Sequence, residues 1–224
     1  MKNVWKGKIN VDGKEVESTV SVPPTLLFSA AAKIDDVSKT VTLGLKRAGD
    51  IVYVIGETKN ELGGSEYYAY RGEQERGEAY LGNKVPKVDT ETARDIYKAV
   101  SHATEAGLVH SAHTPTIGGL GIGIVQSAFA GNLGVDIDLS SVPAREAERD
   151  DTLLFSESNS RFIVTVPPEK AAQFEEVVSG LAFGRVGRVT EDASITIRGL
   201  GGDAIVDIDL TTLKSEWKSA MRDM

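Results

Sequence analysis

The chain has 224 residues, a formal net charge of -8 and a hydrophobic fraction of 41%, enough for one large globular domain or two small ones. It contains no cysteine, which excludes disulfides, thiolate metal sites and thiol nucleophiles. The acidic balance argues against a nucleic-acid partner, which needs a basic surface. With no apolar leader and no stretch of about 20 apolar residues, we expect a cytoplasmic protein with no membrane partner.

The N-terminal region has the patterns of β-strands. Apolar and polar residues alternate over residues 4–11 and 16–22, on either side of Asp12-Gly13, and this predicts a β-hairpin. An apolar run at residues 25–31 follows Pro23-Pro24 and is typical of a buried strand.

A second apolar run, residues 51–56, follows Gly49-Asp50 and also predicts a buried strand. The stretch from Arg71 to Lys87 is polar and rich in glycine, it loses all periodicity, and Pro86 would break a continuing helix. We therefore expect two domains, residues 1–84 and 85–224.

The second domain is predicted to alternate between helices and strands. Asp89 can cap a helix over residues 90–106 that Gly107 ends, and residues 118–130 are apolar on all sides, as a buried helix would be. Pro167-Pro168 opens another helix. A last helix is expected to bury Leu213, Trp217, Ala220 and Met221.

Strands are predicted between these helices. A short one is expected at residues 108–113, and period-two alternation predicts strands with one solvent-facing side at residues 134–139, 161–166, 194–197 and 204–209. Strands and helices interleave without a strict βαβ rhythm, so we expect a mixed sheet with helices packed on one face. The fold class is therefore α+β, or mixed α/β.

The segment from residue 109 to residue 123 is a first candidate site, because a strand and a turn lead into a helix start at Gly118-Gly119. Backbone amides exposed by glycine at such a start favour phosphate. Glycines also let a helix pack closely against a sheet, and the spacing matches no dinucleotide or P-loop motif, so packing is the favoured interpretation. His110 and His113 are expected on one side of the strand, where hydrogen-bonded histidines are more typical than a metal site.

A second candidate site is the polar run of residues 155–162. Its hydroxyls at Ser156 and Ser158, the carboxylate of Glu157 and the guanidinium of Arg161 could bind a phosphate or a sugar. An ordinary capped loop with an Arg161–Glu157 pair is an equally good explanation. Residues 61–68 are a third candidate segment. A turn followed by a helix N-cap is the favoured interpretation of this segment, and a ligand-binding loop is the second.

Several of these segments, in this order, resemble the second half of formylglycinamidine ribonucleotide amidotransferases, also called phosphoribosylformylglycinamidine synthases. This family lies in the superfamily of aminoimidazole ribonucleotide (AIR) synthetase. The resemblance covers nearly the whole chain and is most specific at residues 61–67. The other matching segments are residues 22–30, 34–42, 49–58, 111–113, 118–120, 155–162 and 184–192.

The resemblance implies an activity: ATP and glutamine-derived ammonia convert formylglycinamide ribonucleotide to the amidine, a C–N ligase reaction of purine biosynthesis. It also implies a fold, with residues 1–84 as part of a strand-rich domain like the AIR synthetase N-terminal domain. Residues 85–224 would form the α/β domain like its C-terminal domain. ATP or ADP and Mg²⁺ would serve the complete enzyme.

On this resemblance, the residues of this chain that would contact nucleotide or phosphate are His113, Gly118, Gly119, Ser156, Glu157, Ser158 and Arg161. Thr114 and Ile117 replace two aspartates of the family motif, so a carboxylate that would hold the metal is missing. We therefore assign no catalytic residue, no metal ligand and no cofactor to this chain alone.

The family's catalytic histidine and most of its ATP-binding residues would lie upstream of Met1. The expected partners are therefore the upstream half of the synthase and its glutaminase and small accessory subunits. Self-association with a second copy of the chain is also expected. The alternative is a non-catalytic nucleotide-binding or scaffold subunit of the same superfamily.

Overall fold

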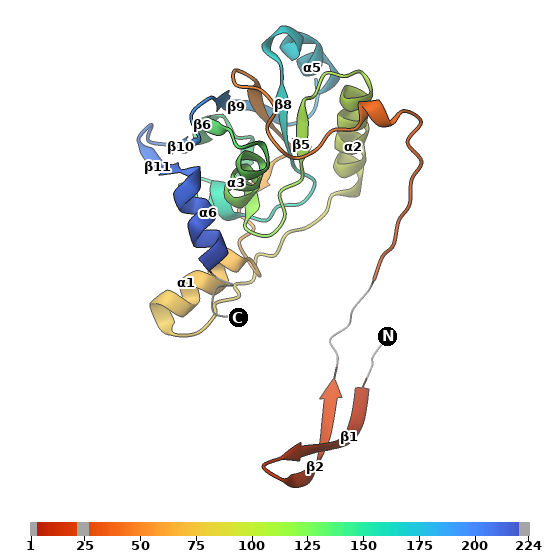
Figure 1. Ribbon diagram of the computed structural model, residues 1–224, viewed down its shortest axis with the longest axis vertical. Coiled ribbons are helices and arrows are strands. Elements are labelled where there is room, and N and C mark those ends of the chain that lie inside the picture. The colour runs from red at the N-terminus through yellow and green to blue at the C-terminus, as the bar shows by residue number, and fades with distance from the viewer. Residues whose placement is uncertain (1–3, 22–26, 220–224) are drawn as a thin grey trace. The chain divides into compact units, whose positions relative to one another are not determined.

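The computed structural model describes residues 4–21 and 27–219 (Figure 1). They divide into two compact units, one ending at Val37 and the other beginning at Ser38. The strands are β1 Val4–Val11, β2 Lys14–Ser21, β3 Ile51–Ile55, β4 Thr58–Lys59, β5 Ser111–His113, β6 Gly134–Asp138, β7 Ala144–Arg145, β8 Phe162–Val166, β9 Phe183–Thr190, β10 Ser194–Arg198 and β11 Ala204–Asp209. The α-helices are α1 Glu66–Arg76, α2 Thr90–Glu105, α3 Gly119–Gly131, α4 Asp150–Phe155, α5 Ala171–Val177 and α6 Leu210–Ser219, and short 3-10 turns lie at Val37–Lys39, Leu139–Ser141 and Pro168–Lys170.

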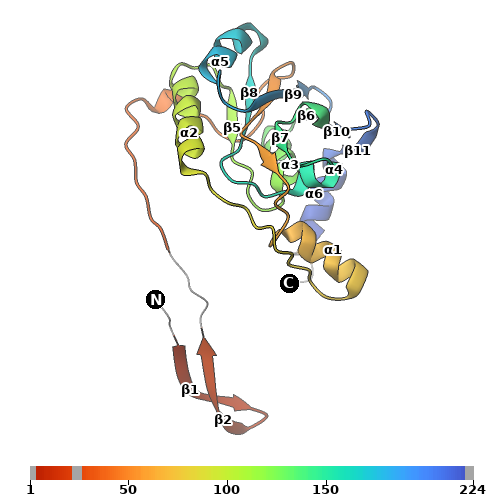
Figure 2. The same cartoon turned by 180° about the vertical axis from the view of Figure 1, so that it is seen from behind.

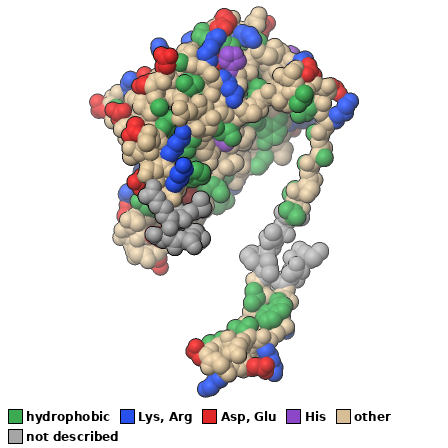
Figure 3. All heavy atoms as spheres, viewed as in Figure 1, with side chains coloured by type: hydrophobic (Ala, Val, Ile, Leu, Met, Phe, Trp, Pro, Cys, Tyr) green, Lys and Arg blue, Asp and Glu red, His purple; other side chains and the backbone are tan. Residues whose placement is uncertain are grey.

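The smaller unit contains the predicted hairpin, which is confirmed. β1 and β2 pair antiparallel around Asp12 and Gly13, whose φ angles of 52° and 81° are those that a tight hairpin turn requires. The register places one set of exposed apolar side chains on the same face of the ribbon: Trp5, Ile9, Val11, Val16 and Val20. Figure 3 shows hydrophobic side chains at the surface of this hairpin.

The buried strand predicted at residues 25–31 is wrong for residues 27–31. These residues form no strand, and the side chains of Leu27 and Phe28 are 89% and 82% exposed. An apolar run becomes a buried strand only when another strand satisfies its backbone groups, and within the described residues none pairs with it. Residues 25 and 26 lie outside the described part of the chain.

The larger unit is built on one mixed sheet, whose described strands have the order β11-β10-β6-β9-β3-β8-β5. β10 and β6 run parallel, and the other neighbouring pairs are antiparallel. β3, predicted from its apolar run, lies near the centre of the sheet with every residue buried. The predicted fold class, α+β with a mixed sheet, is confirmed.

Helices cover both faces of this sheet, so the expectation of helices on one face only is wrong. The side chains of Ile51, Tyr53 and Ile55 pack in one cluster with residues of α2 and α5, whereas Val52 and Val54 pack in another with residues of α3 and α4. Figures 1 and 2 show the helices around the sheet. Strands buried on both sides read as continuous apolar runs, and β3 and β8 have that pattern. The solvent-facing side predicted for residues 161–166 is therefore absent from β8.

The helices begin where capping residues were predicted. Asp89 caps α2 by accepting hydrogen bonds from the amides of Glu91 and Thr92, both at 3.1 Å. The buried helix at α3 and the helix after Pro167-Pro168 are also present. In α6, Leu210 is buried, but Trp217 is 65% exposed, so its predicted burial is wrong. Its ring lies 6.3 Å from the ring of Phe129, which packs against the core, and Ala220 and Met221 lie outside the described residues.

The compact units meet between Val37 and Ser38, whereas the sequence predicted a boundary between residues 84 and 85. The difference arises because β3, which precedes the polar stretch, pairs with β8 and β9, which follow it. The assignment of the chain's two parts to domains like those of AIR synthetase stays a prediction.

The sequence analysis missed several elements. β9 was not predicted as a strand because Gly184 and Gly187 interrupt its alternation. α4 and the short ribbon formed by β4 and β7 were also missed, and α1 continues into the stretch where no helix was expected. Within the described residues, no helix has both the length and the apolar character needed to cross a membrane.

Candidate functional site

The polar loop between α4 and β8 forms a network of hydrogen bonds with the segment around β4. Ser156 donates from Oγ to the carbonyl of Lys59 at 2.6 Å, and its Oγ accepts from the amide of Glu61 at 3.3 Å. Ser158 Oγ accepts from the amide of Lys59 at 3.0 Å. Both serines are buried, so their hydroxyls fix the backbone that follows β4.

Arg161 is fully buried, and its guanidinium turns inward. Nε donates to the carbonyl of Ser158 at 3.0 Å, one terminal nitrogen donates to Oγ1 of Thr58 at 2.8 Å, and the other donates to the carbonyl of Ser156. Burial lowers the pKa of Arg161 to about 10, and the nearby carboxylates of Glu61 and Glu157 oppose that shift. Arg161 therefore remains charged at neutral pH, and these two carboxylates balance its charge.

Glu157 links the starts of two helices. Its Oε1 accepts from the amide of Gly118, ahead of α3, at 2.9 Å and from the amide of Glu66, the first residue of α1, at 3.3 Å. Amides at a helix start carry partial positive charge and are the usual place for a bound anion. In this structure a carboxylate of the chain itself is placed there.

The glycines at the start of α3 allow close packing. Gly118 and Gly119 have φ angles of 83° and 64°, which L side chains rarely adopt. A Cβ on Gly119 would lie 2.6 Å from the carbonyl oxygen of Ser156. The favoured packing interpretation of this segment is therefore the one that the geometry supports.

The two histidines of the segment have different partners. His113 Nε2 lies 2.8 Å from Oε1 of Gln126 on α3. His110 Nδ1 lies 2.7 Å from Oδ2 of the buried Asp50, whose other oxygen accepts from Nε of Arg47 at 3.2 Å. The structure thus joins five of the seven predicted site residues in one network: Gly118, Ser156, Glu157, Ser158 and Arg161. Gly119 lies close to the Ser156 carbonyl, but its amide donates to the carbonyl of Thr116, and His113 is hydrogen-bonded elsewhere.

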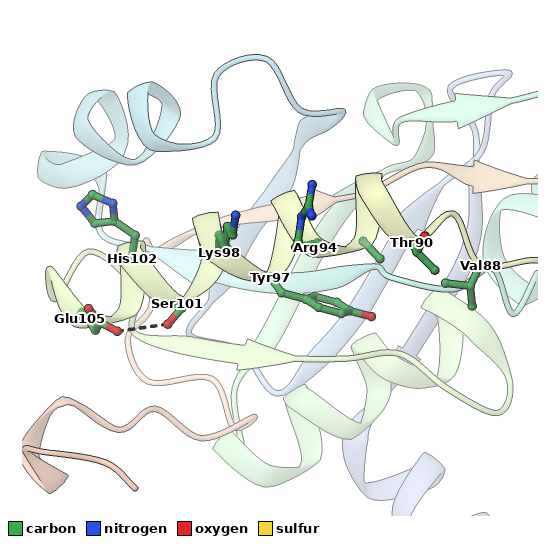
Figure 4. A pocket seen from close by; sticks show the side chains of 9 residues that line it. Val88, Thr90, Arg94, Tyr97, Lys98, Ser101, His102 and Glu105 are labelled. Atoms are coloured by element: carbon green, nitrogen blue, oxygen red, sulfur yellow. Dashed lines mark hydrogen bonds between the residues drawn. The ribbon is translucent and has the colours of Figure 1, made fainter. Parts of the chain in front are cut away.

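A hollow of about 720 Å³ lies along α2 on the larger unit and contains none of the predicted site residues. Figure 4 shows Arg94, Lys98 and His102 on one side of the helix and Tyr97, Ser101 and Glu105 on the other, with Ser101 bonded to Glu105. Nearly all its lining comes from this one helix. The groups do not converge on a common point, as those of a binding site would.

A smaller hollow of about 290 Å³ adjoins the polar network on the side of Lys59. Its lining includes four basic residues that the sequence analysis did not select: Lys59, Lys84, Lys87 and Arg145. The only sequence signal was the concentration of lysines between residues 84 and 87. Arg145 is brought there by the pairing of β4 with β7, which no local pattern indicates.

The sheet and its helices define an α+β domain in which helix α3, which begins at Gly119, packs against the polar loop between α4 and β8. Residues 47–199 match the family described as "AIR synthase related protein, C-terminal domain". This match covers more than half of the sequence, and the chain belongs to the AIR synthase-related family.

Relatives support the resemblance expected from the sequence. The chain is 32% identical over 204 residues to the phosphoribosylformylglycinamidine synthase subunit PurL of Alkaliphilus metalliredigens, covering 90% of this chain and 26% of that protein. It is also similar to the structure of Thermotoga maritima PurL complexed with FGAR, with a TM-score of 0.69 and 23% identity over 79% of this chain and 30% of that one. The ATP complex of the same protein gives a TM-score of 0.61 and 22% identity over 79% of this chain and 27% of the other.

The predicted resemblance to phosphoribosylformylglycinamidine synthases is thus confirmed, and the structural neighbours confirm the fold. The chain spans about a quarter of the length of the curated relative that it matches. The predicted contacts of His113, Gly118, Gly119 and the Ser156–Arg161 loop with nucleotide or phosphate stay predictions.

Proposed function

We propose that this chain supplies a C-terminal, AIR synthase-related domain to an ATP-dependent C–N ligase of purine biosynthesis. The reaction converts formylglycinamide ribonucleotide to the amidine with glutamine-derived ammonia. A polypeptide equivalent to the remainder of PurL provides the other part of the active site. The observation that carries this proposal is the 32% identity to PurL over 90% of the chain.

In this chemistry the amide oxygen is phosphorylated and ammonia then displaces the phosphate. The protein must therefore hold two substrates in register and keep water away from the activated intermediate. The rigid loop of Ser156, Ser158 and Arg161 suits that task as a support, because its polar groups are hydrogen-bonded within the chain. We propose that this loop shapes the domain surface and leaves direct substrate contact to other groups.

The start of α3 does not fit a metal-bound nucleotide. Mg²⁺ prefers carboxylate and other oxygen ligands, but the two motif positions hold Thr114 and Ile117, and Ile117 is 64% exposed. The Gly118 amide is also engaged by Glu157. We therefore propose that ATP and Mg²⁺ bind in the complete enzyme at residues outside this helix start.

The partners follow from the length of the relatives. The principal partner would be the upstream half of the synthase, with its glutaminase and small accessory subunits. A second copy of the chain is a further possible partner, because the hairpin exposes one apolar face.

The replaced aspartates favour one alternative, a non-catalytic scaffold subunit of the same superfamily. Both functions predict a complex with the upstream half, but only the first predicts that the complex is active. The experiment therefore has to measure binding and turnover in the same samples.

The test combines the purified chain with Alkaliphilus metalliredigens PurL from which the matching 204-residue segment has been deleted. We expect a complex on size-exclusion chromatography and ADP release that requires both formylglycinamide ribonucleotide and ammonia. The truncated protein alone is the matched control and should be inactive. A stable but inactive complex would favour the scaffold alternative, and failure to form any complex would contradict both.

A further inference from the structure

The hollow beside the polar network is lined by basic residues from three segments of the larger unit. We call Lys59, Lys84, Lys87 and Arg145 the lysine groove. Lys59 ends β4, Arg145 ends β7, and the two lysines lie on the connection between α1 and α2. The hollow has a volume of about 290 Å³, enough for a small phosphorylated group.

The backbone under the lysine groove is held in place by specific contacts. Lys59 is fixed from below by the hydroxyls of Ser156 and Ser158. The amide of Gly63 donates to the carbonyl of Lys84 at 2.8 Å, and the amide of Lys87 donates to Oε1 of Glu61 at 3.2 Å. The backbone that carries these lysines is therefore positioned before any ligand arrives, which lowers the backbone part of the entropic cost of binding.

Like charges lie close together in the lysine groove. Lys59 and Arg145 are directly paired across the parallel ribbon of β4 and β7, an arrangement that brings like charges together. Arg145 has an ion pair with Glu57 at 2.7 Å. Among the described residues, no carboxylate lies within ion-pair distance of the amino groups of Lys59, Lys84 or Lys87.

The acidic residues that also line the hollow, Glu61 and Glu146, do not neutralise these lysines by direct pairing. Glu61 accepts from the backbone of Lys87, and its charge acts on the buried Arg161. Asp89 in the adjoining hollow acts electrostatically on Lys59 without pairing with it directly. In a chain with a net charge of -8, these three lysines therefore form a local cluster of positive charge.

We propose that the lysine groove binds the phosphate group of a small phosphorylated ligand. Lysine ammonium groups bind phosphate as point charges with several donors each, and they suit a ligand whose orientation is fixed elsewhere. An adjoining hollow of about 390 Å³, which shares Lys59, Lys87 and Arg145, provides room for the rest of the ligand. Its carboxylates, Asp95 among them, can accept hydrogen bonds from ligand hydroxyls. This inference does not depend on the proposed function, because it concerns binding by this chain alone.

The test is a titration of the full-length chain with inorganic pyrophosphate, followed by amide chemical shifts at constant ionic strength. We expect saturable shifts at residues 59, 84–87 and 145. The double variant Lys84→Gln/Lys87→Gln should weaken binding by about tenfold, because each exposed charge pair contributes a few-fold in affinity. Lys98→Gln, which removes the same charge from exposed α2, is the matched control and should bind like the unmodified chain.

Each outcome decides the proposal. Saturable binding that is lost in the double variant and kept in the control supports it. Equal binding by both variants, shifts centred on Gly118 and Ser156, or no saturable shift at millimolar pyrophosphate overturns it. Thermal melting of each variant verifies that the fold is retained, and the exposed positions of Lys84 and Lys87 favour that result.

Discussion

Replacing Arg161 by methionine should destabilise the larger unit severely. The substitution keeps most of the side chain's length but removes the guanidinium, so the carbonyls of Ser156 and Ser158 and the hydroxyl of Thr58 lose their donor in a buried site. It also leaves the charge of Glu61 without its buried partner. Removing one member of such a network costs about 3 to 5 kcal/mol, equivalent to a fall in melting temperature of about 10 °C for a unit of this size.

The assay is equilibrium urea unfolding followed by circular dichroism, with Arg185→Met as the matched control. Arg185 lies on β9 and is exposed, so the same chemical change should alter the unfolding free energy by less than about 0.5 kcal/mol. In the double variant Arg161→Met/Glu61→Gln, the cost should be smaller than the sum of the single effects by about 1 kcal/mol, because the charge of Glu61 is no longer left without its partner.

A cost below about 1 kcal/mol for Arg161→Met would refute this reasoning. It would mean that the guanidinium is not committed to the loop, and that Arg161 is available for an incoming anion, as the sequence first indicated. A normal cost with no coupling to Glu61 would refute only the charge-balance part.

Three further predictions follow from the same contacts. Gly119→Ala should cost at least about 2 kcal/mol in urea unfolding, since its Cβ would meet the carbonyl of Ser156 at 2.6 Å, whereas Gly107→Ala, with a φ of 67° but open space, should cost only about 1 kcal/mol. The pKa of Asp89 is lowered by hydrogen bonds from the amide of Thr92 and then from that of Glu91. The stability that the charged Asp89 gives to the folded chain is therefore present above its ordinary pKa of 3.8 and is lost as the pH falls through the lowered pKa. Asp89→Asn should keep the helix cap and remove this part of the acid dependence of α2 helicity, measured by circular dichroism. Tyr67→Phe should cost about 1 kcal/mol by removing the 2.8 Å bond to Asp151, while thermal melting of a Tyr67→Leu variant should show a larger loss because the ring also stacks on Phe155 at 4.7 Å.

Elements with local signals could be predicted from the sequence. The cap at Asp89, the stop at Gly107 and the turn at Asp12-Gly13 each act through their own backbone, so α2 and the hairpin were found close to their true bounds. β9 was missed because the glycine at position 187 is required by a contact with a residue far away in the sequence. A Cβ at this position would lie 2.0 Å from the carbonyl oxygen of Asp136 on the neighbouring strand β6. Such a contact has no signature within a window of neighbouring residues.

The candidate site shows the same division. The loop around residue 160 was found because hydroxyls, a carboxylate and a guanidinium are concentrated there. The orientation of these side chains could not be predicted. Composition does not reveal whether the guanidinium of Arg161 donates to solvent or, as in the structure, to the carbonyls of Ser156 and Ser158. Nor could Arg145 be placed beside Lys59, because the pairing of their strands spans more than 80 residues of sequence.

The carboxylate of Glu157 at the start of α3 has a consequence for recognition. Because it is tethered, it competes with any free anion at an effective concentration of about the millimolar range. A phosphate could occupy the Gly118 amide only by also displacing Glu157 from the Glu66 amide at α1. The carboxylate of Glu157 thus opposes the binding of phosphate at the start of α3. Phosphate binding at other places on the domain is not opposed by this carboxylate.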